Sequence, residues 1–221
     1  MKLARPDLFH PRIVLAGSDG DAAATADDAG LVGALRRRGL HARRLPWDDP
    51  DTAGADLVIL RSDAGTRDRR DEFLAWTRRV SHLLNPPAAV AWNLDERYLR
   101  DLDDAGVPTT PRGTAPEASL IFLGGEQSHA WPVEPEFESW DLGYAAIAAA
   151  AGRAGIAAGE LLYARADVAG DRLLALDLVA PSLGWRRLDT AARDLAQRRF
   201  ALAVESACDR LGLGPLSHRG P

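Results

Sequence analysis

Two aspartates on a predicted β-hairpin are the strongest candidates for chemistry in this sequence. Asp167 and Asp177 lie in two apolar runs that flank Ala169-Gly170-Asp171, a sequence typical of a tight turn. Side chains alternate between the two faces of a strand, so Arg165 shares a face with Asp167, and Ala175 shares one with Asp177. We expect the two carboxylates to face each other across the pair. Carboxylate oxygens are ligands for Mg²⁺, which usually keeps several waters and substrate phosphates as well.

Two other interpretations of these residues stay open. A pair of aspartates on a hairpin is, in most proteins, simply a solvated sheet face. A second candidate, Glu126, follows Gly124-Gly125 and could line a substrate cleft together with His129. The same two glycines between apolar runs also predict an ordinary hairpin turn.

Strands alternate with helices in the first half of the chain, which predicts parallel pairing and a small doubly wound α/β domain. The expected strands are 12–16, 41–45 and 56–61, and the expected helices are 27–39, 67–84 and one that starts with Asn93 as its N-cap. The second half predicts hairpins around Gly124-Gly125 and Gly170, with helices at 140–155 and 190–211.

Composition is that of an ordinary globular protein of 221 residues with net charge −5. This mildly acidic balance gives no electrostatic reason to expect nucleic acid or a membrane as a partner. Cys208 is the only cysteine, which excludes a disulfide framework and a thiolate metal site. Neither a signal peptide pattern nor a long apolar run is present in the sequence, so we expect a cytoplasmic protein.

The predicted hairpin resembles the C-terminal metal-binding hairpin of ATP-grasp enzymes, the carboxylate–amine ligases that include glutathione synthetase and RimK-like proteins. In that family an Asp is followed eight and ten residues later by Glu and by Asn or Glu, and then by Pro. Here the four places hold Asp167, Ala175, Asp177 and Pro181. The resemblance implies that Asp167 and Asp177 are metal ligands and that Ala175 replaces the glutamate that bridges two Mg²⁺ ions.

The first half resembles the preATP-grasp domain of an actinobacterial-type subfamily, which is itself similar to the ATP-grasp enzyme of cycloserine biosynthesis. The resemblance is carried by WDDPD at 47–51, DLVILRS at 56–62, RDEFLAW at 70–76, LLNPP at 83–87 and WNLDERYL at 92–99. The sequence departs from that pattern at Ala64-Gly65-Thr66, where the family carries Trp-Asp-Tyr, and at Glu96, where it carries Lys.

After Pro108 the resemblance implies a central subdomain whose lysines grip the phosphates of ATP. Instead the chain passes almost at once to a strand pair at 119–130, and Lys2 is its sole lysine. We therefore expect an internally truncated, degenerate homologue that self-associates, because loss of the subdomain would uncover a sheet edge around Leu120 to Leu123.

These observations predict an α/β protein in two parts, a preATP-grasp-like domain at 1–108 and a reduced ATP-grasp-like antiparallel domain at 109–221. The leading functional hypothesis is a non-catalytic protein that binds a small molecule, its own copies or an intact ATP-grasp relative, with no cofactor. The alternative is an ATP- and Mg²⁺-dependent carboxylate–amine ligase that uses Arg165, Glu126 and the two aspartates, with a second chain completing the site. A third hypothesis is a deletion product without selected function.

Overall fold

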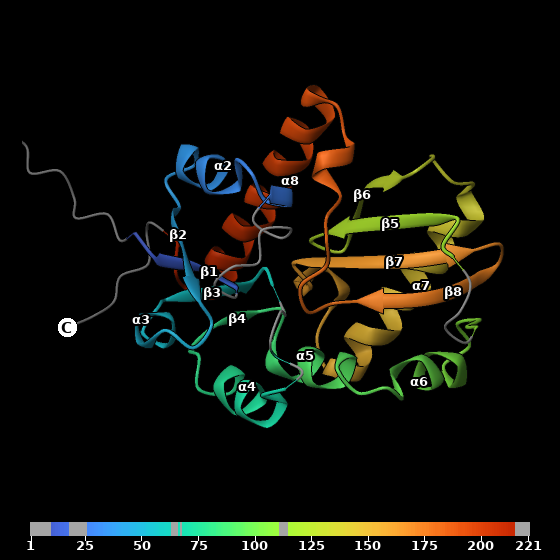
Figure 1. Ribbon diagram of the computed structural model, residues 1–221, viewed down its shortest axis with the longest axis horizontal. Coiled ribbons are helices and arrows are strands. Elements are labelled where there is room, and N and C mark those ends of the chain that lie inside the picture. Colours follow the sequence, from blue (N-terminus) through green and yellow to red (C-terminus); the bar gives the residue numbers. More distant parts are fainter. Residues whose placement is uncertain (1–9, 18–25, 63–65, 67, 111–114, 215–221) are drawn as a thin grey trace, which may run out of the picture.

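Two four-stranded sheets lie side by side in the computed structural model (Figure 1). The structure describes residues 10–17, 26–62, 66, 68–110 and 115–214. The first sheet is parallel with the strand order β2-β1-β3-β4, and the second is antiparallel with the order β6-β5-β7-β8. The predicted fold class is therefore confirmed.

The centre of the parallel sheet is built from short, almost fully apolar runs at 13–16 and 57–60 that are buried on both faces, whereas the edge strand at 41–46 is mostly exposed or half-buried. Its strands are β1 (Arg12–Gly17), β2 (His41–Pro46), β3 (Leu57–Leu60) and β4 (Leu83–Leu84). The helices of this half are α2 (Leu31–Arg37), α3 (Pro50–Ala53), α4 (Arg70–Thr77), α5 (Pro87–Asn93) and α6 (Tyr98–Asp104).

The predicted helix over 67–84 is wrong in its second half. Helix α4 ends at Thr77, and Leu83 and Leu84 form the edge strand β4 opposite Val58 and Ile59. A backbone bond of 2.8 Å from Val58 N to His82 O extends this pairing. Pairing with a buried strand overrides the local helical spacing, because it satisfies the backbone groups of β3.

Asn93 is not the N-cap of the following helix. It is the last residue of α5, and its buried side chain reaches the second sheet instead. Nδ2 donates to the carbonyl of Leu176 at 2.9 Å, and Oδ1 accepts from the amide of Leu178 at 2.7 Å. This asparagine therefore ties α5 to the end of the last strand.

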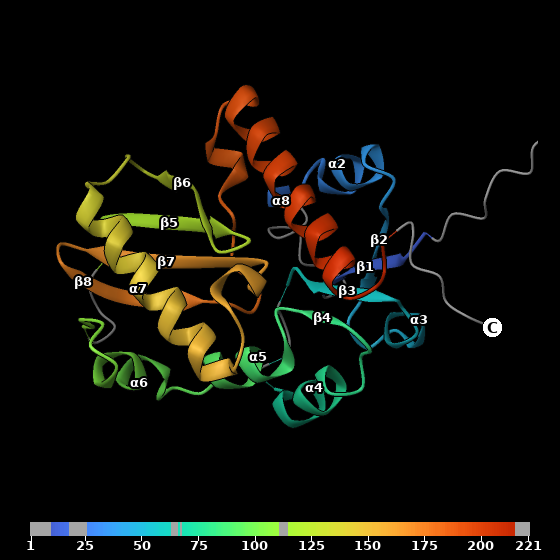
Figure 2. The same cartoon turned by 180° about the vertical axis from the view of Figure 1, so that it is seen from behind.

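In the antiparallel sheet β5 lies between β6 and β7, and α7 covers one face (Figures 1 and 2). Its elements are β5 (Ala118–Leu123), β6 (Glu126–Trp131), α7 (Phe137–Ala154), η1 (Ala158–Glu160), β7 (Tyr163–Ala169), β8 (Arg172–Asp177), η2 (Trp185–Arg187) and α8 (Thr190–Arg210). All six residues of β5 are buried, so the expectation of an uncovered sheet edge at Leu120 to Leu123 is wrong. The predicted turn at Gly124-Gly125 is confirmed, with φ of 62° and 79°.

Buried polar side chains join the two sheets. Asn85 Nδ2 donates to the carbonyls of Tyr163 (2.9 Å) and Leu178 (2.8 Å). The hydroxyl of Tyr163 in turn lies within hydrogen-bonding distance of the carbonyls of Leu60 (2.7 Å) and Val179 (2.9 Å). Asn85, which follows β4, thus bonds to the backbone of β7, and Tyr163 at the start of β7 bonds to the end of β3, which fixes the relative position of the two sheets.

A buried ion pair between Arg61 and Asp28 extends this junction. Their side chains are 2% and 0% exposed, and Arg61 Nη2 lies 2.8 Å from Asp28 Oδ1 and 3.1 Å from the carbonyl of Pro181. Asp27 Oδ2 accepts from the amides of Leu183 at 2.8 Å and Gly184 at 3.1 Å. The loop that follows β8 is therefore held by Asp27 and Arg61, both from the first half.

Apolar packing also crosses the boundary predicted at residue 108. One hydrophobic cluster contains Ile13 and Leu57 of the first sheet together with Phe200 and Val204 of α8. The division of the chain into domains at 1–108 and 109–221 therefore stays a prediction. In the part of the chain that the structure describes, no helix is both long and apolar enough to cross a membrane.

We predict that Asp28→Asn lowers the free energy of unfolding by about 3 kcal/mol, because it leaves the charge of Arg61 buried without its counter-ion. Asp51→Asn is the control, since the Arg43–Asp51 pair has side chains that are 47% and 69% exposed. Its loss should be under about 1 kcal/mol. Urea denaturation of both variants and the parent measures the difference. Similar losses in the two variants would show that the buried pair does not hold the halves together.

Candidate functional site

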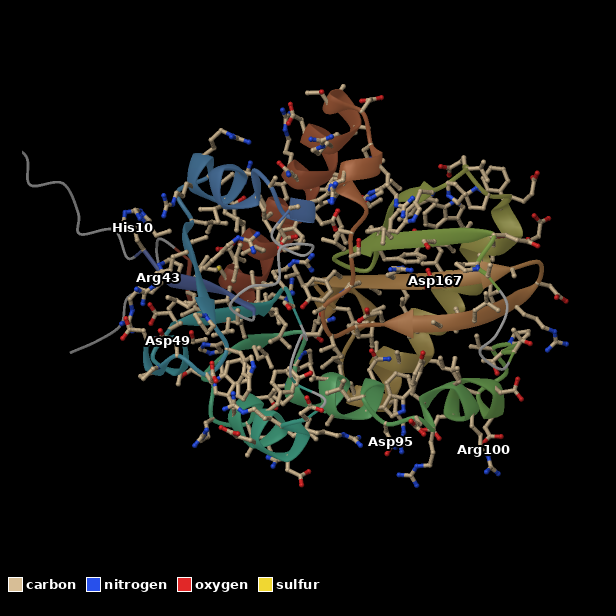
Figure 3. The ribbon with its side chains drawn as sticks, viewed as in Figure 1. His10, Arg43, Asp49, Asp95, Arg100 and Asp167 are labelled. Atoms are coloured by element: carbon tan, nitrogen blue, oxygen red, sulfur yellow. The ribbon has the colours of Figure 1, made fainter. Side chains whose placement is uncertain are left out.

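A cleft of about 670 Å³ lies between the β7–β8 hairpin and the α5–α6 loop. The hairpin contributes Arg165, Asp167, Ala175 and Asp177, and the loop contributes Asp95, Glu96 and Arg97. Figure 3 places Asp167 on the open face of the second sheet and Asp95 below it, in the loop between α5 and α6. Two motifs that lie about seventy residues apart in the sequence therefore meet in one concave site.

Strand alternation directs the four hairpin side chains into this cleft. Ala166, Val168 and Leu176 are buried in the core formed with α7. The intervening residues Arg165, Asp167, Ala175 and Asp177 are half-buried and line the cleft on the other face. The sequence prediction that these four positions share a face is borne out by their placement.

Asp167 and Asp177 do not face each other directly. Asp167 lies opposite Ala175, and Asp177 lies opposite Arg165. The turn places Ala169 opposite Arg172, and a bulge follows between Asp167 and Val168. Turn geometry thus sets a register in which the two carboxylates are diagonal neighbours.

Asp167 is held in a bidentate ion pair with Arg165. Nε and Nη2 of Arg165 each lie 2.8 Å from a different carboxylate oxygen, and Ser119 Oγ donates to Oδ1 at 2.6 Å. The guanidinium also lies over Trp131, 5.6 Å from its ring centroid. Every oxygen of Asp167 therefore has a donor from the protein itself.

Asp177 has a backbone role at the end of β8. Its Oδ1 accepts from the amides of Val179 at 3.0 Å and Ala180 at 3.3 Å. Such bonds close the turn that leads into the loop held by Asp27.

These residues do not fit the magnesium site that the family resemblance implies. Both oxygens of Asp167 are engaged by three hydrogen bonds from Arg165 and Ser119, and Ala175 offers no oxygen. Within the described ranges no group of three or more His, Cys, Asp or Glu side chains could hold a metal ion. Mg²⁺ needs nearly octahedral oxygen coordination, so a site with this donor set would rely almost wholly on water. We assign no metal to the cleft.

The opposite wall of the cleft carries a second bidentate pair, which the sequence reasoning did not identify. Nε and Nη2 of Arg97 lie 3.1 Å and 2.9 Å from the two carboxylate oxygens of Asp95. Hydrogen bonds from the side chain and the amide of Arg97 lower the pKa of Asp95, so this carboxyl stays ionised. The only signal was the WNLDERYL motif, which predicted a helix boundary as readily as a site.

Glu126 lies away from this cleft. It is exposed at the start of β6 and lines a different cavity, beside α8. His129 is half-buried, with Nε2 2.8 Å from the carbonyl of Leu183. Burial lowers the pKa of His129, which favours the neutral imidazole and a structural contact with the loop after β8. Of the two candidate catalytic residues, the cleft contains Arg165.

The first sheet, with helices α2, α3 and α4, matches a known family model. Residues 13–85 match the N-terminal domain of D-cycloserine synthetase DcsG. The cycloserine biosynthesis protein DcsG of Streptomyces lavendulae is 41% identical over 86 residues, which are 37% of this chain and 29% of DcsG. The match therefore spans less than a third of that relative.

Similarity of fold extends over almost the whole chain. The crystal structure of D-cycloserine synthetase DcsG is similar with a TM-score of 0.73 and 21% identity, over 90% of this chain and 99% of that one. D-alanine–D-alanine ligase from Bacillus anthracis gives a TM-score of 0.59 and 8% identity, over 92% and 98%. The macrocyclase MdnB from Microcystis aeruginosa MRC gives 0.53 and 12%, over 86% and 99%. The chain is thus related to DcsG, and its fold is like that of ATP-grasp enzymes.

Proposed function

We propose that this protein is a non-catalytic member of the ATP-grasp fold that binds a small charged molecule in the cleft between the β7–β8 hairpin and the α5–α6 loop. One observation carries the proposal. The guanidinium of Arg165 holds both oxygens of Asp167, the carboxylate that the resemblance implies as a metal ligand.

The ion pair opposes metal binding on energetic grounds. A divalent cation at Asp167 would have to displace or share two charge-assisted hydrogen bonds, and the nearby guanidinium would repel it. Ala175, directly opposite Asp167, gives no oxygen in return. Binding of ATP through magnesium therefore has little support from this hairpin.

The connection between the two sheets gives independent support. The resemblance implies an ATP-clamping subdomain after Pro108, where this sequence has only Thr109 to Glu117 before β5 begins. This segment begins along the edge of β8, with Leu173 N donating to the carbonyl of Pro108 at 2.8 Å and Thr110 N donating to that of Leu173 at 3.0 Å. Internal truncation of a DcsG-like ancestor explains the short connection and the absence of a lysine that could grip phosphate.

The cleft keeps features of a binding site without those of a ligase. It has the volume of a small-molecule pocket and is lined by Arg70, Arg97 and Arg165 together with four acids. Ligands with charged groups of both signs would match this lining. A second chain that supplied the missing clamp would make the protein a ligase. Measurement of ATP turnover distinguishes this ligase from a non-catalytic binding protein.

We predict no ATP turnover. Purified protein incubated with ATP, Mg²⁺ and a panel of amino acids should release ADP and phosphate no faster than a reaction without protein. The same should hold when a DcsG-like relative that keeps its clamp, but has lost the carboxylates of its own metal-binding hairpin, is added as a source of the clamp. Millimolar ATP with Mg²⁺ should leave the melting temperature unchanged, whereas ligand at a hundred times its Kd would add about 2.7 kcal/mol. Amino-acid-dependent ADP release in either mixture would refute the proposal.

Ala175→Glu should tighten Mn²⁺ binding about tenfold without producing ADP, because it adds a carboxylate opposite Asp167. Ala175→Gln is the matched control, since it adds the same length without charge. Without metal, like-charge repulsion should make the Ala175→Glu variant the less stable of the two. Equal Mn²⁺ affinity in both variants, measured by titration, would show that position 175 does not face Asp167.

A further inference from the structure

A second cavity, of about 530 Å³, lies between the β5–β6 turn, η1 and α8. It has no lining residue in common with the cleft. Figure 2 shows α8 running past the β5–β6 turn, on the side of the second sheet that meets the first. The cavity volume is within the range of small-molecule sites.

Glycines allow the walls of this cavity to approach closely. A Cβ at Gly125 would lie 2.8 Å from the carbonyl oxygen of Ala158 and from the Cα of Gly159. A Cβ at Gly124 would lie 3.3 Å from the Cβ of Ala203 on α8. The turn therefore contacts both η1 and α8 through backbone and small side chains.

Charges of opposite sign line the cavity. Glu126 extends from the start of β6, while Arg199, Ser206 and Arg210 come from α8. Residues 199, 206 and 210 recur at spacings of seven and four, which place them on one face of the helix. Arg199 is anchored, because its Nη1 donates to the carbonyl of Ser128 at 3.0 Å.

Among the described residues, none of the ion pairs involves Glu126, Arg199 or Arg210. An acid and two guanidiniums thus line one concave surface without neutralising each other. A ligand that carried both signs of charge would pair with the acid and with a guanidinium at once.

We propose that this cavity binds a small zwitterion. Its ammonium group pairs with Glu126, and its carboxylate or phosphate group pairs with Arg210, where the hydroxyl of Ser206, one helical turn away, donates a hydrogen bond. Because pairs at such exposed positions contribute little each, the site is selective for ligands that make both contacts at once.

The test is a ¹⁵N NMR titration of the full chain. Glycine and phosphoethanolamine are the zwitterions, and they distinguish a carboxylate from a phosphate ligand. Acetate, inorganic phosphate and methylammonium carry one sign of charge each. At least one zwitterion should give saturable shifts at the amides of Gly124, Gly159 and Ser206, with a Kd at least about fivefold below those of the single-charge compounds.

Two neutralising variants locate the site. Glu126→Gln and Arg210→Gln should each weaken zwitterion binding about fivefold or more, while the exposed controls Glu138→Gln and Arg198→Gln should not. Arg165→Gln in the cleft should also have no effect, so the outcome is independent of the cleft proposal. The inference is overturned if neither zwitterion gives saturable shifts, if single-charge compounds bind equally well, or if Glu126→Gln binds like the parent.

Discussion

The buried ion pair between Arg61 and Asp28 is the interaction on which the rest of the structure depends. Burial alone would lower the pKa of Arg61, but the charge and hydrogen bonds of Asp28 outweigh it and the pKa is raised. Two charges removed from water are stabilised further when their remaining groups find hydrogen-bond partners. Here Pro181 supplies a carbonyl to Nη2 of Arg61, and Asp27 holds the amides of the same loop, while Nη1 of Arg61 has no hydrogen-bond partner among the described residues. The pair therefore fixes the end of the β7–β8 hairpin against the first sheet.

A hairpin held in this way can keep its backbone position whatever side chains it presents to the cleft. The overall likeness to DcsG and to D-alanine–D-alanine ligase concerns the arrangement of strands and helices. Activity depends instead on a few side chains at the cleft, and a fold alone does not determine them. In this chain Arg165 satisfies Asp167 where the resemblance implies a cation, so the protein's own guanidinium neutralises that carboxylate. Ala175, which stands where the resemblance implies a bridging glutamate, offers no oxygen to a metal ion.

Patterns local in sequence predicted most elements, and contacts distant in sequence caused the errors. The apolar runs at 12–16 and 56–61 and the Gly124-Gly125 turn identified their strands and hairpin, since burial and turn geometry leave local signals. Asn93 and β4 were misassigned because their partners lie on other strands, and neither partner can be inferred from spacing. The face of the hairpin that carries Asp167 and Asp177 was predicted correctly. The pairing of the two strands was not, because a bulge between Asp167 and Val168 shifts the register. Glu126 was grouped with Arg165 from chemistry alone, and the fold separates them.

We infer that the guanidinium of Arg165, and not a metal ion, binds the carboxylate of Asp167. A crystal structure of the protein grown with millimolar MnCl₂ and a non-hydrolysable ATP analogue tests it most directly, because manganese is located by its anomalous scattering. The account predicts Nε and Nη2 of Arg165 on the two oxygens of Asp167 and no anomalous peak beside Asp167 or Asp177. A manganese peak bonded to both aspartates, with Arg165 displaced, would contradict it.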